Sequence, residues 1–537
     1  MNLSRLLLAI ALAVLPSSLS AQSATLIGHI VDADSGEPIA ARIYLADAAG
    51  KWHFPDSIEG SAVYYKKQGR SSTNSIEMHT TLSAHPFKLT AKPGPITVTI
   101  ERGKEYFTLT KRIDLKPGEN TRRFKLRRWI NMAERGWFSG DTHVHRTLEE
   151  LPNVMLAEDL NVTFPLVYWV THAYQAPTSG NKNLGGAIPD SLIKLDDSHV
   201  IYPRNTEYEI FSVNKKRHTL GAIFFLNHKS VLKLGAPPIG PVAQLARSEG
   251  ALLELDKHNW PWSMMLVAVL NVDLYELSNN HVWRTQFGFK NFGLEAPAYM
   301  KLRPLGEWSE HDWLIYGFRN YYALLNCGFN LRPTAGTASG VHPVPLGFGR
   351  VYVQIGKKFS YNSWIQGLSA GRSFVTTGPM LFAEVDGEKP GHNFEQVKSG
   401  SSFRLRVEII SERRIGPVDI IRNGEVVTSI EAHFEKLANG SYRITLEHPL
   451  KIEESSWVSV RYLERRGGDR TRFAHSGIFH FHVPGKPLRP RKEETDFLIQ
   501  RMEEQIVRSQ GVLSQEGVAE YERALSIYRG IAKRARP

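Results

Sequence analysis

The chain has 537 residues, too many for one hydrophobic core, so its length predicts about three or four domains. Hydrophobic residues make up 42% and charged residues 22%, which is typical of a folded globular protein and excludes a largely disordered one. The net charge of +12 mildly favours acidic surfaces or anionic ligands. The basic residues are spread along the chain without a nucleic-acid-binding motif, so we expect no nucleic-acid partner. Cys327 is the only cysteine, which excludes an internal disulfide.

The first 21 residues have the pattern of a secretory signal peptide. Arg5 supplies a positive charge, residues 6–15 are apolar, and small residues lead up to a cleavage site after Ala21. No later run is long and apolar enough for a transmembrane helix. We therefore expect a periplasmic or secreted protein without a transmembrane anchor.

Residues 24–128 are predicted to be all-β. Short runs rich in β-branched residues, such as 25–31 and 41–45, alternate with turns that contain Gly, Pro and Asp. Several short strands at this spacing favour a β-sandwich. Residues 129–385 change character, because apolar runs such as 164–170 alternate with helical segments such as 313–326. That alternation predicts an α/β barrel, in which sites form at the carboxyl ends of the strands.

Residues 386–484 return to short strands and predict a second sandwich, with Asn423-Gly424 as a hairpin turn. Residues 493–537 have amphipathic helical periodicity and predict two helices that are split near residues 509–511. The sequence thus predicts a multidomain protein that combines α/β and all-β parts.

The most informative stretch is 136–146, which contains His143 and His145. If this is the end of a strand, the two imidazoles point to the same face. Neutral imidazole is the commonest metal ligand in proteins, so the pair predicts half of a metal site. The spacing alone is weak evidence, because His480 and His482 share it.

Other residues of metal-ligand type follow apolar runs through the same region, and a barrel would bring these positions to one rim. They are His172, Glu207, Glu209, His218, His228, the run 254–258 with Glu254, Asp256 and His258, then Glu276 and His342.

The segment 137–146, Trp-Phe-x-Gly-Asp-x-His-x-His-Arg, resembles the opening of the PHP (polymerase and histidinol phosphatase) metallohydrolases, particularly their CehA/McbA-like branch. Further short segments in the same order extend the resemblance over roughly 129–390. The pattern of glycines, aspartate and proline in 28–42 is similar to the carboxypeptidase regulatory-like domains, which are small and usually accessory sandwiches.

The resemblance implies a distorted (β/α)7 barrel with up to three divalent ions. Carried over by position, it implies as metal ligands His143, His145, His172, Glu207 (with Glu209 as an alternative), His218 (with His228 as an alternative), His258 and His342. The family has a late Asp-x-His, which should fall near residues 337–340, where this chain has no aspartate. We therefore expect one or two ions, zinc or manganese, rather than three.

The function implied is that of an exported hydrolase that uses a metal-activated water on an ester, phosphoester or carbamate-like bond of a small molecule. Glu207, His218 and Arg146 are the expected catalytic residues, and Asp141 would orient a ligating imidazole. Arg146 and Arg350 would either hold an anionic substrate group or form structural ion pairs.

Trp169, Trp260 and Trp262 would wall the pocket or lie in the core. The alternative function is a non-catalytic envelope protein that binds carbohydrate or another ligand with a degenerate barrel. The sequence sets no oligomeric state.

Overall fold

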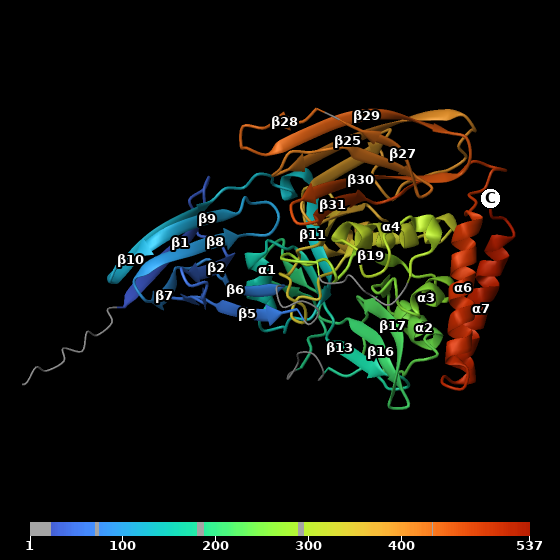
Figure 1. Ribbon diagram of the computed structural model, residues 1–537, viewed down its shortest axis with the longest axis horizontal. Coiled ribbons are helices and arrows are strands. Elements are labelled where there is room, and N and C mark those ends of the chain that lie inside the picture. The colour runs from blue at the N-terminus through green and yellow to red at the C-terminus, as the bar shows by residue number, and fades with distance from the viewer. Residues whose placement is uncertain (1–22, 70–74, 180–186, 288–294, 432) are drawn as a thin grey trace, which may run out of the picture.

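The computed structural model describes residues 23–69, 75–179, 187–287, 295–431 and 433–537, so the predicted signal peptide, 1–21, lies outside the described residues. A β-sandwich at the amino-terminal end, a central α/β region, a second sandwich and a pair of helices follow in chain order (Figure 1). The predicted mixture of α/β and all-β parts is confirmed. Among the described residues, no helix has both the length and the apolar character needed to cross a membrane.

The amino-terminal sandwich has one sheet in the order β10-β1-β7-β4 and another in the order β5-β6-β2-β8-β9. Side chains alternate between buried and partly exposed along β1, so its inward set packs in the core, where Phe87 stacks on Phe124. The strands are β1 (Ala24–Asp32), β2 (Ala41–Asp47), β3 (Trp52–His53), β4 (Asp56–Ser57), β5 (Ala62–Gln68), β6 (Ile76–Leu82), β7 (Phe87–Ala91), β8 (Gly94–Glu101), β9 (Leu109–Leu115) and β10 (Gly118–Leu126).

The central region contains a six-stranded sheet in the order β13-β16-β17-β18-β19-β20, and its edge strand β20 contacts β11 of a second, larger sheet. These strands are β11 (Trp137–Val144), β12 (Val162–Pro165), β13 (Tyr168–His172), β14 (Ile193–Lys194), β15 (Val200–Ile201), β16 (Thr206–Val213), β17 (Lys216–Leu226), β18 (Leu252–Leu255), β19 (Leu274–Ser278), β20 (Arg332–Ala335), β21 (Arg350–Gln354) and β22 (Ser373–Thr376). The helices are α1 (Leu151–Ala157), α2 (Gly240–Ser248), α3 (Ser263–Leu270), α4 (Glu310–Asn326) and α5 (Tyr361–Ser369).

The strand directions depart from the repeated strand–helix units that the sequence predicts. β11 and β12 are parallel, as are β13 and β16, and β18, β19 and β20. However, β16 and β17 form an antiparallel hairpin joined by Asn214 and Lys215, both with positive φ, and β17 is antiparallel to β18. The start of β17 therefore lies at the opposite end of the sheet from the start of β16.

The carboxy-terminal sandwich shares a sheet with the central region, because β31 pairs with β22. This sheet continues through β30, β26 and β27, and a second sheet in the order β23-β25-β29-β28 covers it. β23 lies before residue 386, so the predicted boundary cuts the sandwich. The strands are β23 (Met380–Val385), β24 (Asn393–Phe394), β25 (Ser401–Ser411), β26 (Val418–Arg422), β27 (Glu425–Ile430), β28 (Glu435–Lys436), β29 (Tyr442–Ile452), β30 (Ser456–Arg466), β31 (Arg470–Ser476) and β32 (Phe479–Phe481).

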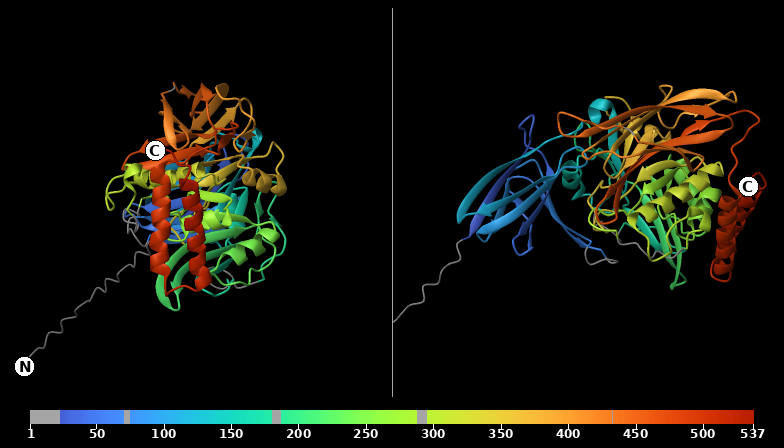
Figure 2. Two further views of the ribbon diagram at one scale, coloured as in Figure 1. Left: turned by 90° about the vertical axis from the view of Figure 1, so that its right-hand side faces the viewer. Right: turned by 45° about the horizontal axis from the view of Figure 1, so that its top comes forward.

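The two predicted terminal helices, α6 (Lys492–Ser509) and α7 (Gln515–Ala532), lie side by side and pack against α3 (Figure 2). The Tyr528 hydroxyl donates a hydrogen bond of 2.7 Å to the carbonyl of Met264 in α3. The Glu520 carboxylate accepts bonds of 3.0 and 2.8 Å from the backbone N–H groups of Ile239 and Gly240 at the start of α2. A carboxylate is favourable at a helix amino terminus, so the tail fixes two central helices.

A buried ion pair joins the amino-terminal sandwich to the central region. Glu77 on β6 accepts a bond of 2.6 Å from Arg284 Nε, and also bonds with Tyr44 (2.8 Å) and His79 (3.1 Å). Burial alone would raise the pKa of Glu77, but Arg284 and His79 hold it at about 2. The ion pair therefore stabilises the docked arrangement only while Glu77 is ionised.

Removal of this charge should destabilise the protein in a pH-dependent way. We expect Glu77→Gln to lower the free energy of unfolding by about 3 kcal/mol near pH 7. A carboxyl group whose pKa is depressed in the folded state loses its contribution to stability as the pH falls through that pKa. The difference in free energy of unfolding between wild type and Glu77→Gln should therefore shrink from about pH 5 to about pH 2.5. Denaturant titration at several pH values measures this difference, with the exposed Glu37→Gln as the control. A gap that is constant with pH would contradict this account.

Candidate metal centre

The predicted histidine pair lies at the carboxyl end of β11 and points to one face of the strand. Both side chains are buried, and their Nε2 atoms are 3.0 Å apart. Two imidazole nitrogens at this distance aim at a common point, as ligands of one ion do.

Glu207, at the start of β16, joins this pair, with Oε2 3.4 Å from His145 Nε2. His143 is also shared with a second group, which contains Asp256 at the end of β18 and Glu276 in β19. His143 Nδ1 is 3.2 Å from Glu276 Oε1 and 3.9 Å from Asp256 Oδ1. Among the described residues, the ligand atoms within each group lie no more than 4.8 Å from one another, and all five side chains are buried.

Gly336 allows the second group to form. A Cβ atom at this position would lie 1.8 Å from Glu276 Oε1 and 2.2 Å from the Cβ of His143, so any other residue would push the two apart. Asp141 holds the segment that contains Gly336 against β11, because it accepts bonds from Thr337 Oγ1 (2.6 Å) and from the backbone N–H groups of His143 (3.1 Å) and Gly347 (2.9 Å). Burial raises the pKa of Asp141 to about 6. Asp141 thus positions the backbone at His143, rather than the imidazole ring as predicted.

The cluster concentrates negative charge away from water. Burial and the nearby Glu254 carboxylate raise the pKa of Glu276 well above its ordinary value. Lys257, itself buried, forms an ion pair with Asp256 Oδ2. The other oxygen of Asp256 is buried and has no hydrogen-bond partner in the described part of the chain.

Buried carboxylates that lack enough partners are costly, and a divalent cation would compensate them. Imidazole with carboxylate is a donor set that suits zinc, manganese or iron. The residues present therefore fit a divalent ion.

A pocket of about 320 Å³ opens onto the cluster, which is a suitable size for a small molecule. His143, His145 and Glu207 contribute to its lining, as do several aromatic and apolar side chains, namely Trp169, Phe211, Trp260, Trp283, Val341 and Pro343.

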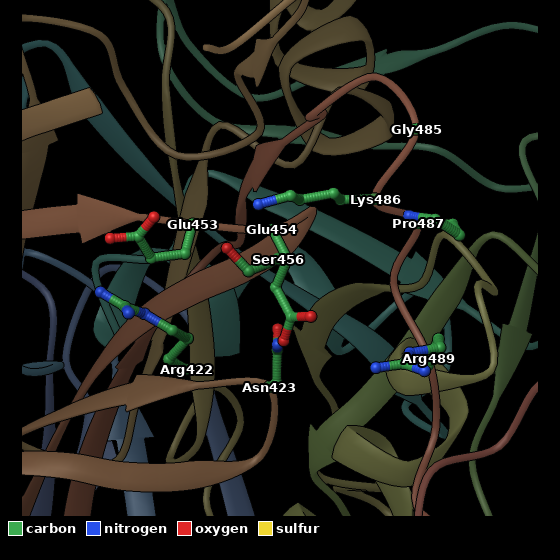
Figure 3. A pocket seen from close by; sticks show the side chains of 9 residues that line it. All are labelled: Arg422, Asn423, Glu453, Glu454, Ser456, Gly485, Lys486, Pro487 and Arg489. Carbon is green, nitrogen blue, oxygen red and sulfur yellow. The ribbon is translucent and has the colours of Figure 1, made fainter. Parts of the chain in front are cut away.

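A roomier cavity of about 630 Å³ lies elsewhere, between the carboxy-terminal sandwich and the linker that follows it (Figure 3). Its charged lining residues are of both signs, and none of its lining residues is a histidine. It offers no counterpart to the cluster at His143.

The structure brings His143, His145 and Glu207 together as metal-type ligands, and it places two further predicted residues in the pocket wall. Glu209 lines the pocket, and its Oε1 is 3.8 Å from Lys257 Nζ. His342 also lines the pocket, with Nε2 3.4 Å from Asn280 Nδ2, but it belongs to neither ligand group.

The other predicted histidine ligands, His172, His218 and His258, lie outside both groups. His172 is exposed and contacts Thr171 Oγ1. His218 lies near the start of β17, beside the hairpin, because the chain reverses after β16 instead of passing through a helix.

His228 is buried, but its two ring nitrogens bond with Thr206 Oγ1 (2.8 Å) and the Ser230 carbonyl (2.7 Å). His258 is enclosed by Tyr275, Trp313 and Tyr316, with ring centroids at 5.2 to 5.8 Å. The ring nitrogens of His228 are thus satisfied locally, whereas both ring nitrogens of His258 are buried without a hydrogen-bond partner among the described residues.

The predicted arginines do not line the pocket either. Arg146 lies 3.8 Å above the Tyr65 ring and donates to Ser339 Oγ at 3.2 Å. Arg350 is buried and, within the described part of the chain, donates to backbone carbonyls, among them that of Gly347 at 2.8 Å. Of the three tryptophans considered, Trp169 and Trp260 line the pocket, whereas Trp262 is fully buried in the core.

The sequence marks Asp256 and Glu276 as residues of metal-ligand type, but neither was predicted as a ligand, although each is a carboxylate on or just after an apolar strand that runs parallel to its neighbour. The sequence also places the amino-terminal sandwich among domains that are usually accessory. Gln68 at the end of β5 lines the pocket, and the Tyr65 hydroxyl accepts a bond of 2.9 Å from Gly340 N and donates to the His342 carbonyl. No local sequence signal marks this contact between distant segments.

Comparisons with known proteins add little. No family model matches the sequence, and no curated protein matches it significantly. One solved structure resembles it, a two-domain protein from Bacteroides vulgatus that contains a predicted PHP-like metal-dependent phosphoesterase. The similarity covers 61% of this chain and 90% of that chain, with 10% sequence identity and a TM-score of 0.27. A TM-score this low does not establish a shared fold.

Histidines inside and outside the ligand groups should differ in their effect on metal affinity. We expect His145→Ala to weaken divalent-metal affinity by at least about 100-fold, because it removes a ligand atom from the cluster. His172→Ala, its matched control, should retain the wild-type affinity within about twofold. Titration of chelator-treated protein with zinc or manganese measures both. Equal losses in the two variants would contradict the assignment.

The hydrogen bonds of the Tyr65 hydroxyl should contribute measurably to the free energy of unfolding. Tyr65→Phe leaves the Gly340 N–H and the His342 carbonyl without their shared partner, so we expect a loss of about 1 to 2 kcal/mol in the free energy of unfolding. Tyr64→Phe removes a hydroxyl from an exposed neighbour on the same strand and should cost under about 0.5 kcal/mol. A larger loss of unfolding free energy in Tyr64→Phe than in Tyr65→Phe would show that the amino-terminal sandwich does not hold the pocket wall.

Proposed function

We propose that this protein is an exported, metal-dependent hydrolase that acts on an ester, phosphoester or carbamate-like bond of a small molecule. The observation that carries the proposal is the pair of buried ligand groups, which share His143 at the base of an aromatic-walled pocket. The resemblance of residues 137–146 to PHP metallohydrolases supports the same reading, with the central region as a distorted barrel of the CehA/McbA-like branch. The signal-like first 21 residues support export to the periplasm or beyond.

The ligand groups define which residues would hold the metal. His143, His145 and Glu207 would hold one ion, and His143, Asp256 and Glu276 offer a second site. We therefore expect one ion, or two ions that share His143, with zinc or manganese as the best match to the donors. When bound, such an ion lowers the pKa of a coordinated water and stabilises negative charge that develops on the substrate.

The pocket walls would bind and orient the substrate. Lys257 brings a positive charge into the pocket, so it takes the role that the sequence assigned to Arg146, contact with an anionic substrate group. Trp169, Trp260 and Phe211 offer aromatic surface that excludes water and packs against an apolar or ring-shaped part of the substrate. Small anionic molecules with such a part are the preferred substrate class.

A binding-only role is the second candidate, and two observations favour it. The ammonium group of Lys257 pairs with Asp256, so a positive charge of the chain already compensates part of the second ligand group. The segment 337–340 also supplies no carboxylate, and Thr337 bonds with Asp141 instead. A centre with one ion or none would then hold a carbohydrate or another ligand without turnover.

Turnover of chromogenic esters separates the two candidates. With zinc or manganese added, we expect hydrolysis of p-nitrophenyl phosphate, its diester or p-nitrophenyl acetate, and a loss of about 1,000-fold or more in kcat/KM for His145→Ala. Lys257→Met should raise KM for a phosphate substrate more than for the uncharged acetate. His172→Ala is the matched control and should keep its activity.

Activity that survives both His145→Ala and a chelator would contradict the hydrolase proposal. Metal binding in the wild type without turnover of any of these esters would favour the binding role.

A further inference from the structure

A third cavity, of about 510 Å³ and with a polar lining, lies where the amino-terminal sandwich, the central region and the carboxy-terminal sandwich meet. It shares no lining residue with the metal pocket. Among the described residues that line it, seven are basic and three are acidic. The basic residues are Arg42 and Lys104 from the first sandwich, Arg284 and Arg350 from the centre, and Arg413, Arg466 and Arg472 from the second sandwich.

Several of these basic side chains have carboxylate partners and serve as structural ion pairs. Arg42 pairs with Glu101 and Glu158, and Arg472 lies 3.3 Å from Glu310. Arg466 pairs with Glu464. Glu158 and Glu310 belong to the central region, so the pairs of Arg42 and Arg472 connect it to the two sandwiches, whereas Arg466 and Glu464 lie on the same strand, β30.

Lys104 and Arg350 are different, because no carboxylate of the described residues lies within 4.0 Å of either. Lys104 Nζ donates to the Thr377 carbonyl at 3.1 Å and lies 3.9 Å above the Phe348 ring. The Arg350 guanidinium donates hydrogen bonds to the backbone carbonyls of Gly347, Asp159 and Glu158. Basic side chains thus outnumber acidic ones among the described residues that line the cavity, and the hydrogen bonds that Lys104 and Arg350 donate go to backbone carbonyls.

The surplus of positive charge has an electrostatic cost. Burial and the guanidinium groups of Arg472 and Arg350 lower the pKa of the Lys104 ammonium well below its ordinary value. Burial also lowers the pKa of Arg472 to about 10. A bound anion would turn this repulsion into attraction, since charge-assisted hydrogen bonds from arginine and lysine to an oxyanion are among the strongest in proteins.

We propose that this cavity is a binding site for a multivalent oxyanion of the phosphate type, held by Lys104 together with the arginines that surround it. The planar fork of arginine matches the geometry of phosphate, and lysine adds a point charge. The volume accommodates a free phosphate or a small phosphate monoester. Because the basic residues come from all three regions, the anion would connect the two sandwiches to the central region.

Phosphate binding by the full chain tests this proposal. Calorimetric titration with inorganic phosphate, at constant ionic strength set with sodium chloride, should show saturable binding and a higher melting temperature. Lys104→Met should weaken the affinity by about tenfold, while Lys104→Arg and the exposed Lys111→Met on β9 should retain it. Because Lys104→Met relieves repulsion, its melting temperature without phosphate should equal or exceed that of the wild type, which shows that the variant folds.

Two further experiments locate the bound anion and distinguish free phosphate from a phosphate monoester. His143→Ala should retain phosphate binding, because the metal pocket is separate; a loss in this variant would place the anion at the metal cluster and overturn the proposal. Tighter binding of glycerol phosphate than of inorganic phosphate would identify a phosphate monoester as the ligand, and the reverse order would identify the free ion. Undiminished binding in Lys104→Met, or no saturable binding of either ligand by the wild type, would overturn the proposal.

Discussion

Buried negative charge beside the end of β11 is the constraint on which the functional centre depends. Glu207, Asp256 and Glu276 are enclosed with two imidazoles, and the Lys257 ammonium pairs with Asp256. Three buried carboxylates this close to one another repel when all are ionised. The cluster must therefore take up protons or a cation. The imidazole donors and the short distances at His143 favour a divalent metal.

The rest of the molecule holds this cluster in place. Asp141 fastens the segment with Gly336 to β11, and Tyr65 of the first sandwich fastens the end of the same segment at Gly340 and His342. At the other side, Glu520 of α7 binds the start of α2. The amino-terminal sandwich, of a type that is usually accessory, is thus connected to the pocket wall, and the terminal helices are connected to the central helices. This arrangement explains why a long chain surrounds a small site.

Sequence patterns predicted the parts of this structure that depend on local periodicity. The alternation in β1, the paired terminal helices and the Asn423-Gly424 turn, with positive φ at both residues, all follow from local chemistry. The partners of His143 depend instead on strand direction, which no local pattern sets. The hairpin of β16 and β17 places His218 beside the turn, away from the two ligand groups, and His258 lies among aromatic rings two residues after Asp256. The role of Tyr65 depends on its hydrogen bonds to Gly340 and His342, far along the chain, which no local sequence pattern predicts.

The central claim is that the shared histidine lies between two groups of metal ligands. Its most direct test is a crystal structure of the protein soaked with zinc or manganese, with anomalous diffraction measured at the absorption edge of the metal. The account predicts an anomalous peak bound by His143, His145 and Glu207, with any second peak at Asp256 and Glu276. An anomalous map without a peak at His143, in a protein that holds its metal elsewhere, would contradict it.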